Sequence, residues 1–424
     1  MNRDDIVIVG GGLAGLRAAE RLRERGFSGA ITMVGEEPVA PYNRPPLSKQ
    51  MLTGKMRPDE LSFQTFTRLA VQFRPGRRAT GLDPRSRQVH LDTGEELPYG
   101  GLIVATGVKP RVLPTAPPHD ERIAMLRTLD DLRKLEGLMG SARRIAVVGG
   151  GFIGCEVAAS ARRRAIDVTL IDRAPVLLHR VLGPELGAVL TDVHREAGVE
   201  LRLGAAIDRW STGRGGVTLD LSDGTVVQAD VVLVAIGTMP ATEWLEESGV
   251  DTTDGLLCDE TCHVVGLDHV VAAGDVARWP NLRFDRVPRR VEHWINAVEH
   301  GRAAADSLLD GRQRARAFAP VPRFWSEQHG MKIQSVGMPA LADRIVLAQG
   351  ELARREFVAA YLQGDRVVGA LGFNSSRSML KFAEVVGASN PLPVVSLVDH
   401  HAFARQRGAH HPVPPHTTSV GVGA

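Results

Sequence analysis

The chain has 424 residues, with 51 lysines and arginines against 49 aspartates and glutamates, a net charge of +2. This length exceeds a single comfortable core, so two or three domains are expected. The balanced charge gives no reason to expect nucleic-acid or membrane binding. The sequence has no apolar run long enough for a membrane span and no signal segment, so we expect a cytoplasmic protein.

The first apolar run leads into a phosphate-binding pattern. Ile6–Val9 are β-branched and are followed by three glycines in the spacing G-x-G-x-x-G. Such glycines permit a tight turn, close backbone approach to a pyrophosphate, and close packing of helix on strand. A helix expected from Leu16 to Arg25 would stabilise the anion with its free amides and dipole. The residues expected to form this site are Gly10, Gly12, Leu13, Ala14 and Gly15.

An acidic residue follows the next predicted strand. Residues 30–35 have the composition of a short buried strand, and Glu36 comes directly after them. A carboxylate at this point can accept hydrogen bonds from a ribose diol. A capping or surface role is the alternative.

A hairpin and a further strand occur once in each half of the chain. Gln88–Leu91 and Leu97–Tyr99 predict a hairpin that leads into a strand over 102–107. The second half repeats this order, with strands expected over 217–221 and 231–237. The repetition predicts an internal duplication of a nucleotide-binding domain.

The second glycine pattern follows Ile145–Val148, about 140 residues after the first. A helix is expected from Cys155 to Ala165. Two such turns imply that one chain binds two dinucleotides, as in a flavin enzyme that is reduced by a nicotinamide nucleotide. The residues expected at this turn are Gly149, Gly151, Phe152, Ile153 and Gly154.

The second turn has its own downstream acid. Val168–Ile171 predicts a strand that ends at Asp172. A carboxylate there pairs with ribose hydroxyls and would repel a 2′-phosphate, which favours NADH over NADPH. Arg173 and Arg180 lie close by in the sequence and keep NADPH open as an alternative.

Three cysteines in the whole chain argue against a disulfide framework. Cys155 falls within the second glycine turn, and Cys258 and Cys262 have a three-residue gap between them. We expect all three to be small core residues. We expect neither a redox dithiol nor a metal site.

The C-terminal part predicts a small α/β domain, with strands over 332–336, 344–347, 357–362 and 367–371 and a helix over 376–386. His410, His411 and His416 stand among prolines in a segment expected to be a flexible tail. Three histidines in such a segment do not define a metal geometry.

Several longer motifs are more specific than the glycine turns. They are Tyr-Asn-Arg-Pro-Pro-Leu-Ser-Lys over 42–49, Ala-Thr-Gly-Val-Lys-Pro-Arg over 105–111, Leu-Arg-Thr-Leu-Asp over 126–130, Ala-Ala-Gly-Asp-Val-Ala over 272–277, Arg-Val-Glu-His-Trp over 290–294 and Phe-Trp-Ser-Glu-Gln over 324–328. With these motifs the chain resembles the flavin-dependent, NADH-using ferredoxin reductases that supply Rieske oxygenases and bacterial cytochromes P450. Putidaredoxin reductase and biphenyl dioxygenase reductase are of this family. Asn43 departs from its pattern, as does His329 with Gly330.

The resemblance implies an α/β fold with two Rossmann-like dinucleotide-binding domains, in the three-layer arrangement of glutathione reductase, and a small α/β C-terminal domain. The cofactors would be FAD and NADH. The implied domains are an FAD-binding domain over 1–111 and 241–321, an NAD-binding domain over 112–240, a C-terminal domain over 322–404 and a tail over 405–424.

The resemblance also assigns roles to charged residues. Arg44 and Arg111 would lie on the FAD phosphates or ring edge, which suits planar cations. Lys49 would lie near flavin N5 and pair with Glu156, and these two residues are the expected catalytic pair. A plain surface ion pair is the alternative for Lys49 and Glu156.

Asp275 would bond the ribityl chain, with the N-terminus of a following helix facing the flavin; a plain helix cap is the alternative. Trp325 would cover one face of the ring system, unless it is a core tryptophan. The remaining implied cofactor contacts are Ala79, Ala105, Thr106, Gly107, Arg180, Ala235, Ile236, Gly237, Gly274, Glu292, His293, Trp294 and Ala297.

The expected reaction is hydride transfer from NADH to FAD, followed by single-electron transfer to a ferredoxin that serves a cytochrome P450 or a Rieske oxygenase. We expect a 2Fe–2S ferredoxin, with other cluster types left open, and a monomer or weak homodimer. An NADH oxidase, a rubredoxin reductase and a redox-sensing flavoprotein of the apoptosis-inducing type are the alternatives.

Two arginine clusters, over 283–290 and at Arg312, Arg314 and Arg316, are candidates for docking an acidic ferredoxin near the flavin. Solvated loops and helix faces would explain both clusters equally well.

Overall fold

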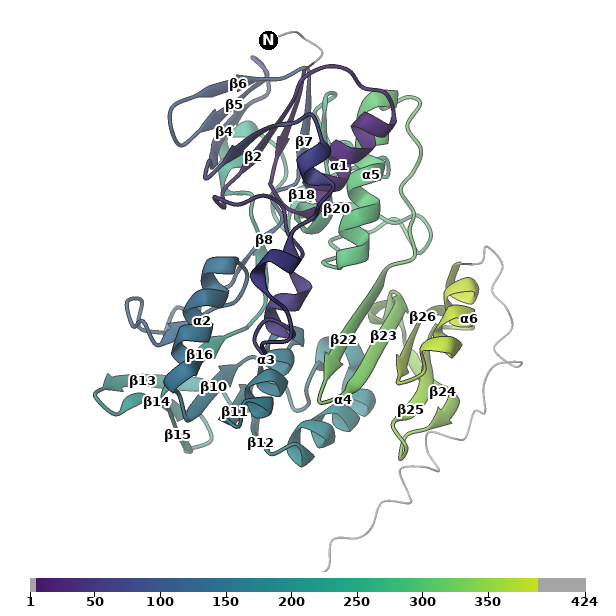
Figure 1. The fold of residues 1–424 in the computed structure, drawn as a ribbon. Coiled ribbons are helices and arrows are strands. Elements are labelled where there is room, and N and C mark those ends of the chain that lie inside the picture. Colours follow the sequence, from purple (N-terminus) through teal and green to yellow (C-terminus); the bar gives the residue numbers. More distant parts are fainter. Residues whose placement is uncertain (1–4, 388–424) are drawn as a thin grey trace, which may run out of the picture.

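The structure is a computed structural model that describes residues 5–387 (Figure 1). The first glycine pattern lies in a five-stranded parallel sheet. Every residue of its central strand β1 is buried, as expected for a parallel sheet covered on both faces. In spatial order the strands are β19 (Val270–Ala272), β7 (Gly101–Val104), β1 (Ile6–Val9), β2 (Ile31–Gly35) and β3 (Gln72–Pro75).

The second glycine pattern lies in another five-stranded parallel sheet of the same design. The strand of the glycine turn is again central, with the acid-bearing strand on one side and the later strand on the other. In spatial order the strands are β9 (Ile123–Ala124), β16 (Val231–Val234), β10 (Arg144–Val148), β11 (Asp167–Asp172) and β12 (Val199–Leu203). The predicted duplication is thus confirmed in the strand order.

Each parallel sheet is accompanied by a three-stranded antiparallel sheet, which contains the predicted hairpin. The first consists of β4 (Ala79–Asp83), β5 (Gln88–Leu91) and β6 (Glu96–Pro98). The second consists of β13 (Ile207–Gly213), β14 (Gly216–Leu221) and β15 (Val226–Ala229). In both cases the last strand of the antiparallel sheet is followed directly by a buried strand of the neighbouring parallel sheet, β7 in the first half and β16 in the second.

The helices after the two glycine turns are α1 (Leu13–Glu24) and α3 (Phe152–Arg163). Both begin three residues earlier than predicted. The reason is that the middle glycines, Gly12 and Gly151, are themselves the N-caps, with extended backbone and no side-chain cap. The first helical turn therefore lies inside the G-x-G-x-x-G pattern.

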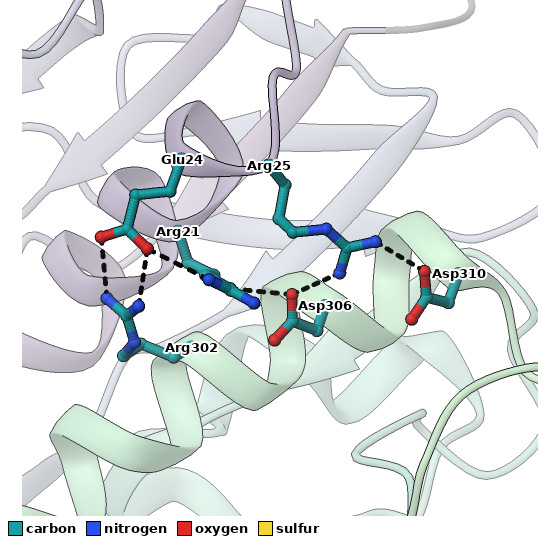
Figure 2. A network of polar contacts seen from close by, with 6 residues as sticks. All are labelled: Arg21, Glu24, Arg25, Arg302, Asp306 and Asp310. Atoms are coloured by element: carbon teal, nitrogen blue, oxygen red, sulfur yellow. Dashed lines mark hydrogen bonds and ion pairs between the residues drawn. The ribbon is translucent and has the colours of Figure 1, made fainter.

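Helix α5 (Trp294–Asp310) packs on α1. Gly301 permits this approach, because a Cβ at that position would collide with the carbonyl oxygen of Ala14. Ion pairs connect the outer surfaces of the two helices (Figure 2). They join Arg21 to Asp306, Arg25 to Asp306 and Asp310, and Arg302 to Glu24, while Arg21 also pairs with Glu24 of its own helix.

The C-terminal part forms a five-stranded antiparallel sheet and helix α6 (Ser376–Gly387), as predicted from the sequence. Strand β22 is not among the strands predicted from the sequence, although its residues contain the Phe-Trp-Ser-Glu-Gln motif. In spatial order the strands are β22 (Arg323–Gln328), β23 (Met331–Gly337), β26 (Arg366–Phe373), β25 (Glu356–Gln363) and β24 (Arg344–Glu351).

The other elements cover the sheets or connect them (Figure 1). They are the helices α2 (Leu129–Ser141) and α4 (His179–Glu196), the strands β8 (Val108–Pro110), β17 (Thr238–Pro240), β18 (Leu256–Leu257), β20 (Ala277–Pro280) and β21 (Pro288–Arg289), and the 3₁₀ turns η1 (Pro45–Ser48), η2 (Pro58–Leu61), η3 (Phe66–Arg68), η4 (Glu243–Ser248), η5 (Gly274–Val276) and η6 (Pro339–Leu341). Within residues 5–387, no helix combines the length and apolar character needed to cross a bilayer.

The domain boundaries proposed from the sequence stay predictions. The last part of the expected C-terminal domain, the expected tail and its three histidines lie outside the described residues.

Candidate active site

A cavity of about 1100 Å³ is lined by both glycine turns, by η1 and by β22. This volume is larger than a pocket for one drug-sized molecule, roughly 300–1,000 Å³. The predicted residues that line it are Gly10, Gly12, Leu13, Ala14, Glu36, Arg44, Lys49, Ala79, Ala105, Thr106, Gly107, Gly151, Phe152, Ile153, Glu156, Ala235, Gly237, Gly274, Asp275, Glu292, His293, Trp294, Ala297 and Trp325.

Seven predicted residues lie outside the lining of this cavity: Gly15, Arg111, Gly149, Gly154, Asp172, Arg180 and Ile236. Gly15 and Gly154 are packing residues, because a Cβ on either would collide with the carbonyl oxygen of the first glycine of its own motif. Arg111 and Arg180 have exposed side chains. Their contact with a cofactor stays a prediction.

The two turns fit a bound pyrophosphate. A Cβ on Gly12 or Gly151 would meet nothing within 4 Å, so the backbone there is open to the cavity. Neither helix has an acidic residue in its first turn or a side chain capping its amides. The first-turn amides of α1 and α3 are therefore available to a phosphate group.

The predicted ion pair of Lys49 and Glu156 is present, with 2.6 Å between Nζ and Oε2. Both side chains are largely shielded from solvent, at 15% and 3% exposure. Two serines that had no predicted role complete this site. Ser48 donates to Oε2 of Glu156 and Ser326 donates to Oε1, each at 2.6 Å. A buried carboxylate of this kind is stable because both oxygens are paired.

Arg44 lines the cavity, but its guanidinium is held by protein groups. It pairs with Glu37, donates to the hydroxyl of Tyr42 at 3.0 Å and donates to the backbone carbonyl of Arg127 at 2.9 Å. The Tyr42 hydroxyl in turn donates to Glu37 at 2.6 Å. The cation predicted to contact FAD is therefore fixed in position by its neighbours.

Asp275 lies in η5 and forms an ion pair with Arg127, at 3.3 Å between Oδ2 and Nη2. Burial raises the pKa of Asp275, and the positive charge of Arg127 opposes that rise. Arg127 is a cavity residue that sequence analysis quoted within a motif without giving it a role. Asp275 is followed directly by strand β20, and the next helix along the chain is α5. The N-terminus of α5, with His293 as its N-cap, reaches the cavity, and its contact with the flavin stays a prediction.

Aromatic side chains form one wall of the cavity. Trp325 is 36% exposed and meets Trp294 edge to face, with 5.8 Å between ring centroids. The indole of Trp294 donates to Oδ1 of Asn43 at 3.0 Å, so the departure from the family pattern at this position has a defined partner. Phe152 and Phe324 also meet edge to face, at 4.8 Å.

The two acids that end their strands differ in their surroundings. Glu36 is exposed and lines the cavity. Asp172 accepts hydrogen bonds from the backbone amides of Gly150 and Ala174, one at each carboxylate oxygen. Asp172 is thus bound to the second glycine turn itself, and its contact with a ribose stays a prediction.

All three cysteines are buried and free, as core residues. Burial raises the pKa of each thiol well above its ordinary value. None of the three lines the cavity. The expectation that they are small core residues is confirmed.

The expectation that Arg312, Arg314 and Arg316 lie near the flavin is wrong. They follow the far end of α5, a helix of 17 residues. At 1.5 Å per residue, that end lies roughly 25 Å from Trp294 at the cavity. Arg312 is also held by Asp259 and by two backbone carbonyls. The three arginines are close to Trp325 in sequence but not in space, because the connection from α5 to β22 runs along the outside of the molecule (Figure 1).

Two phosphate-binding turns on one cavity, each on its own parallel sheet, define an oxidoreductase that binds two dinucleotides. Comparison with known families agrees: residues 4–301 match the pyridine nucleotide-disulphide oxidoreductase family, and residues 323–406 match the reductase C-terminal family. The chain belongs to the pyridine nucleotide-disulphide oxidoreductase family, and its cofactors are FAD and NAD(H).

Similar proteins include putidaredoxin reductase of Pseudomonas putida, which is 36% identical over 393 residues, covering 89% of this chain and 92% of that protein. The ferredoxin–NAD(+) reductase component of the biphenyl dioxygenase system of Paraburkholderia xenovorans LB400 is 33% identical, covering 93% of this chain and 95% of that protein. Among solved structures, a covalent putidaredoxin reductase–putidaredoxin complex matches with a TM-score of 0.87 and 32% identity, covering 95% of this chain and 99% of that chain.

Proposed function

We propose that this protein is an NADH:ferredoxin reductase whose partner is a small 2Fe–2S ferredoxin serving a cytochrome P450 or a Rieske oxygenase. The proposal rests on which side chains line the cavity. The cavity contains the paired charges of Lys49 and Glu156, and none of the three cysteines of the chain lines it. A reductase that passes electrons to a disulfide needs thiols beside its flavin, so this site suits an acceptor that comes from outside.

The names of the similar proteins support the same reading, since both relatives described above are reductases of ferredoxin-type carriers. The solved complex contains a reductase together with its putidaredoxin. The choice between a P450 and a Rieske oxygenase as terminal enzyme rests on similar proteins alone, whose names include a dioxygenase system and a CYP199A2 system.

Bound FAD supplies the redox chemistry, accepting a hydride from NADH and releasing electrons one at a time. The turn at Gly12 would bind the FAD pyrophosphate and the turn at Gly151 the NADH pyrophosphate. The ammonium of Lys49, held by Glu156, would place a fixed positive charge beside the atom that receives the hydride. Such a charge acts without reorganisation because its partner is buried and fully hydrogen-bonded.

The route of electrons to the partner would pass the aromatic wall of the cavity. Trp325 and Trp294 both line the cavity, and about a third of the surface of Trp325 is open to solvent. A carrier that docks against this wall would come close to the cavity that would hold the flavin. We therefore place the ferredoxin at the Trp325 rim, and not at the arginines after α5.

The test is NADH-driven reduction of cytochrome c by the purified holoprotein, with and without candidate ferredoxins of 2Fe–2S and other cluster types. A large stimulation by one ferredoxin is the expected result. Equal rates with and without every ferredoxin, with oxygen consumption to match, would indicate an NADH oxidase. Stimulation by rubredoxin only would indicate a rubredoxin reductase, and slow flavin reduction with no productive carrier would favour a redox-sensing protein.

A further inference from the structure

A buried chain of hydrogen bonds runs from Glu156 into the C-terminal sheet. Oε1 of Glu156 accepts from Ser326 Oγ at 2.6 Å, and Ser326 Oγ accepts from Gln328 Nε2 at 3.0 Å. Oε1 of Gln328 lies 2.9 Å from Nε2 of His194, and Nδ1 of His194 lies 3.2 Å from Nε2 of His329. The chain thus connects the cavity to a half-buried histidine four side chains away.

The chemistry of the groups allows only one direction for the protons. An ionised carboxylate only accepts, so the single hydroxyl proton of Ser326 points to Glu156. Ser326 can then only accept from the amide group of Gln328, which leaves the Gln328 oxygen facing His194. His194 must therefore carry its proton on Nε2 and accept at Nδ1 from His329. Every proton of the chain points toward Glu156.

The surroundings of the two histidines agree with this arrangement, which requires the His194 ring to be neutral because its Nδ1 accepts a hydrogen bond. Burial lowers the pKa of His194 to about 4. Burial and the nearby positive charges of Arg162 and Arg163 also lower the pKa of His329 to about 4. Ser326, Gln328 and His194 are almost fully inaccessible to solvent, so no water competes for these hydrogen bonds.

The fold explains why this chain of hydrogen bonds forms. Ser326 and Gln328 are two residues apart on β22 and so point to the same side of the strand, toward α3 and α4. Trp325 directly precedes Ser326, so its side chain points to the other side of the strand, and it lines the cavity. One strand therefore presents an aromatic ring to the cavity and supports the catalytic carboxylate from behind. On the other oxygen, η1 supplies Ser48 and the adjoining Lys49.

We propose that Ser326, Gln328 and His194 are positioning residues for the reduction step: they fix the rotation of the Glu156 carboxylate and thereby the place of the Lys49 ammonium beside the cofactor. The proposal rests on the cofactor side of the proposed function and is independent of the identity of the carrier. Without the donor at Ser326, Oε1 of Glu156 has no partner and the carboxylate turns away from its present plane. Lys49 then loses its fixed position while every cofactor contact is kept.

The test compares Ser326→Ala with two matched variants of the holoprotein. Ser335→Ala is the control, because Ser335 is an equally buried serine on the neighbouring strand β23 whose hydroxyl has no hydrogen-bond partner. Ser326→Thr keeps the hydroxyl. We expect Ser326→Ala to slow anaerobic FAD reduction by NADH about tenfold, the worth of one charge-assisted hydrogen bond. Ser335→Ala should change it less than about twofold, and Ser326→Thr should restore most of the rate.

Two readouts besides activity accompany the rate. The midpoint potential of bound FAD should become more negative in Ser326→Ala, because a fixed cation stabilises the added negative charge of the reduced form. In ¹⁵N spectra of histidine-labelled protein, His194 and His329 should both be neutral with the proton on Nε2 from pH 8 to pH 5. The variant His329→Asn, suited to the left-handed backbone at this position, identifies their signals.

If Ser326→Ala fails to fold, Gln328→Met tests the next residue of the hydrogen-bond chain. The rate of FAD reduction should again fall, and the midpoint potential of FAD should again become more negative. Potentials and rates of both variants equal to those of Ser335→Ala would overturn the proposal, as would a His194 proton on Nδ1. None of these measurements uses a ferredoxin. A protein that reduces no ferredoxin would refute the proposed function and leave this inference standing.

Discussion

Helices α1 and α3 each begin from a glycine turn with the same spacing, yet different elements cover them. Helix α1 is covered by α5, and the contact carries partly exposed ion pairs on its outer side (Figure 2). Helix α3 is covered by η1 and β22. The residue two positions after the third glycine is Arg17 in α1 and Glu156 in α3. Arg17 pairs with Glu20 of its own helix, whereas Glu156 pairs across the cavity with Lys49.

We infer that the glycine turn serves phosphate binding in both helices and that the covering element sets the chemistry beside each helix. Exposed ion pairs gain little, because water and salt screen them and ordered side chains lose entropy. A buried charge is retained only where its partners are complete, as at Glu156. The predictions below test whether this division holds.

The largest effect is expected at Glu156, in contrast to Arg17 at the equivalent position of α1. Glu156→Gln should slow anaerobic reduction of FAD by NADH on the order of 100-fold, because the Lys49 ammonium loses its anionic partner. Lys49→Met should act in the same direction. Arg17→Gln, which likewise removes the charged group at the matching place on α1, should leave the rate within about twofold. Stopped-flow absorbance of the flavin measures all three, and equal losses in Arg17→Gln and Glu156→Gln would break the comparison.

Asp172 and Glu36, the two acids that follow or end their strands, should affect different cofactors. Asp172→Ala should lower the preference for NADH over NADPH about tenfold, by removing both a ribose acceptor and a repulsion against the 2′-phosphate. Glu36→Ala should leave that ratio unchanged and weaken retention of FAD. Steady-state kinetics with both nucleotides, with flavin content measured on the same samples, separates the two effects. A native enzyme more efficient with NADPH would show that the assignment of Asp172 is mistaken.

A smaller effect is expected from the thiols. Replacement of Cys155, Cys258 and Cys262 together by Ala should leave NADH-to-ferricyanide activity within a few-fold of the parent protein, since none of them lines the cavity. Stability should fall by about 1 kcal/mol or more, because three buried side chains become smaller. Loss of flavin reduction in a triple variant that still melts cooperatively would mean that a thiol takes part in the reaction.

The smallest effect is expected at the α1–α5 surface. Asp306 bridges Arg21 and Arg25, so Asp306→Asn should lower the free energy of unfolding by less than about 1 kcal/mol. The loss should shrink as salt is added, and flavin reduction should not change. Urea titration at low and high ionic strength measures this effect. Asp192→Asn, which removes a single exposed pair with Arg195, is the control and should cost less.

Much of the fold could be predicted because its signals are local. The glycine spacing, the acid after each second strand and the alternating strands of the C-terminal sheet all lie within short windows of sequence. The start of both helices was misplaced by three residues, since the turn that ends the strand is also the first turn of the helix.

The site was less predictable, because its contacts join distant segments. The pair of Lys49 and Glu156 came from family resemblance, since 107 residues separate them. Ser326 and Gln328 belong to a quoted motif, but nothing local shows that they face Glu156 and His194. The arginines after α5 misled for the opposite reason: they are near Trp325 in sequence and far from it in space.

The central claim is that electrons enter as a hydride beside Lys49 and Glu156 and leave singly to a ferredoxin. It is tested most directly by following NADH-driven reduction of a 2Fe–2S ferredoxin at its visible absorbance, with native protein and Glu156→Gln side by side. The account predicts rapid ferredoxin reduction by the native protein and a loss in Glu156→Gln that matches its slower flavin reduction. Unchanged ferredoxin reduction in Glu156→Gln, or NADH oxidation by the native protein with no reduction of any ferredoxin, would contradict it.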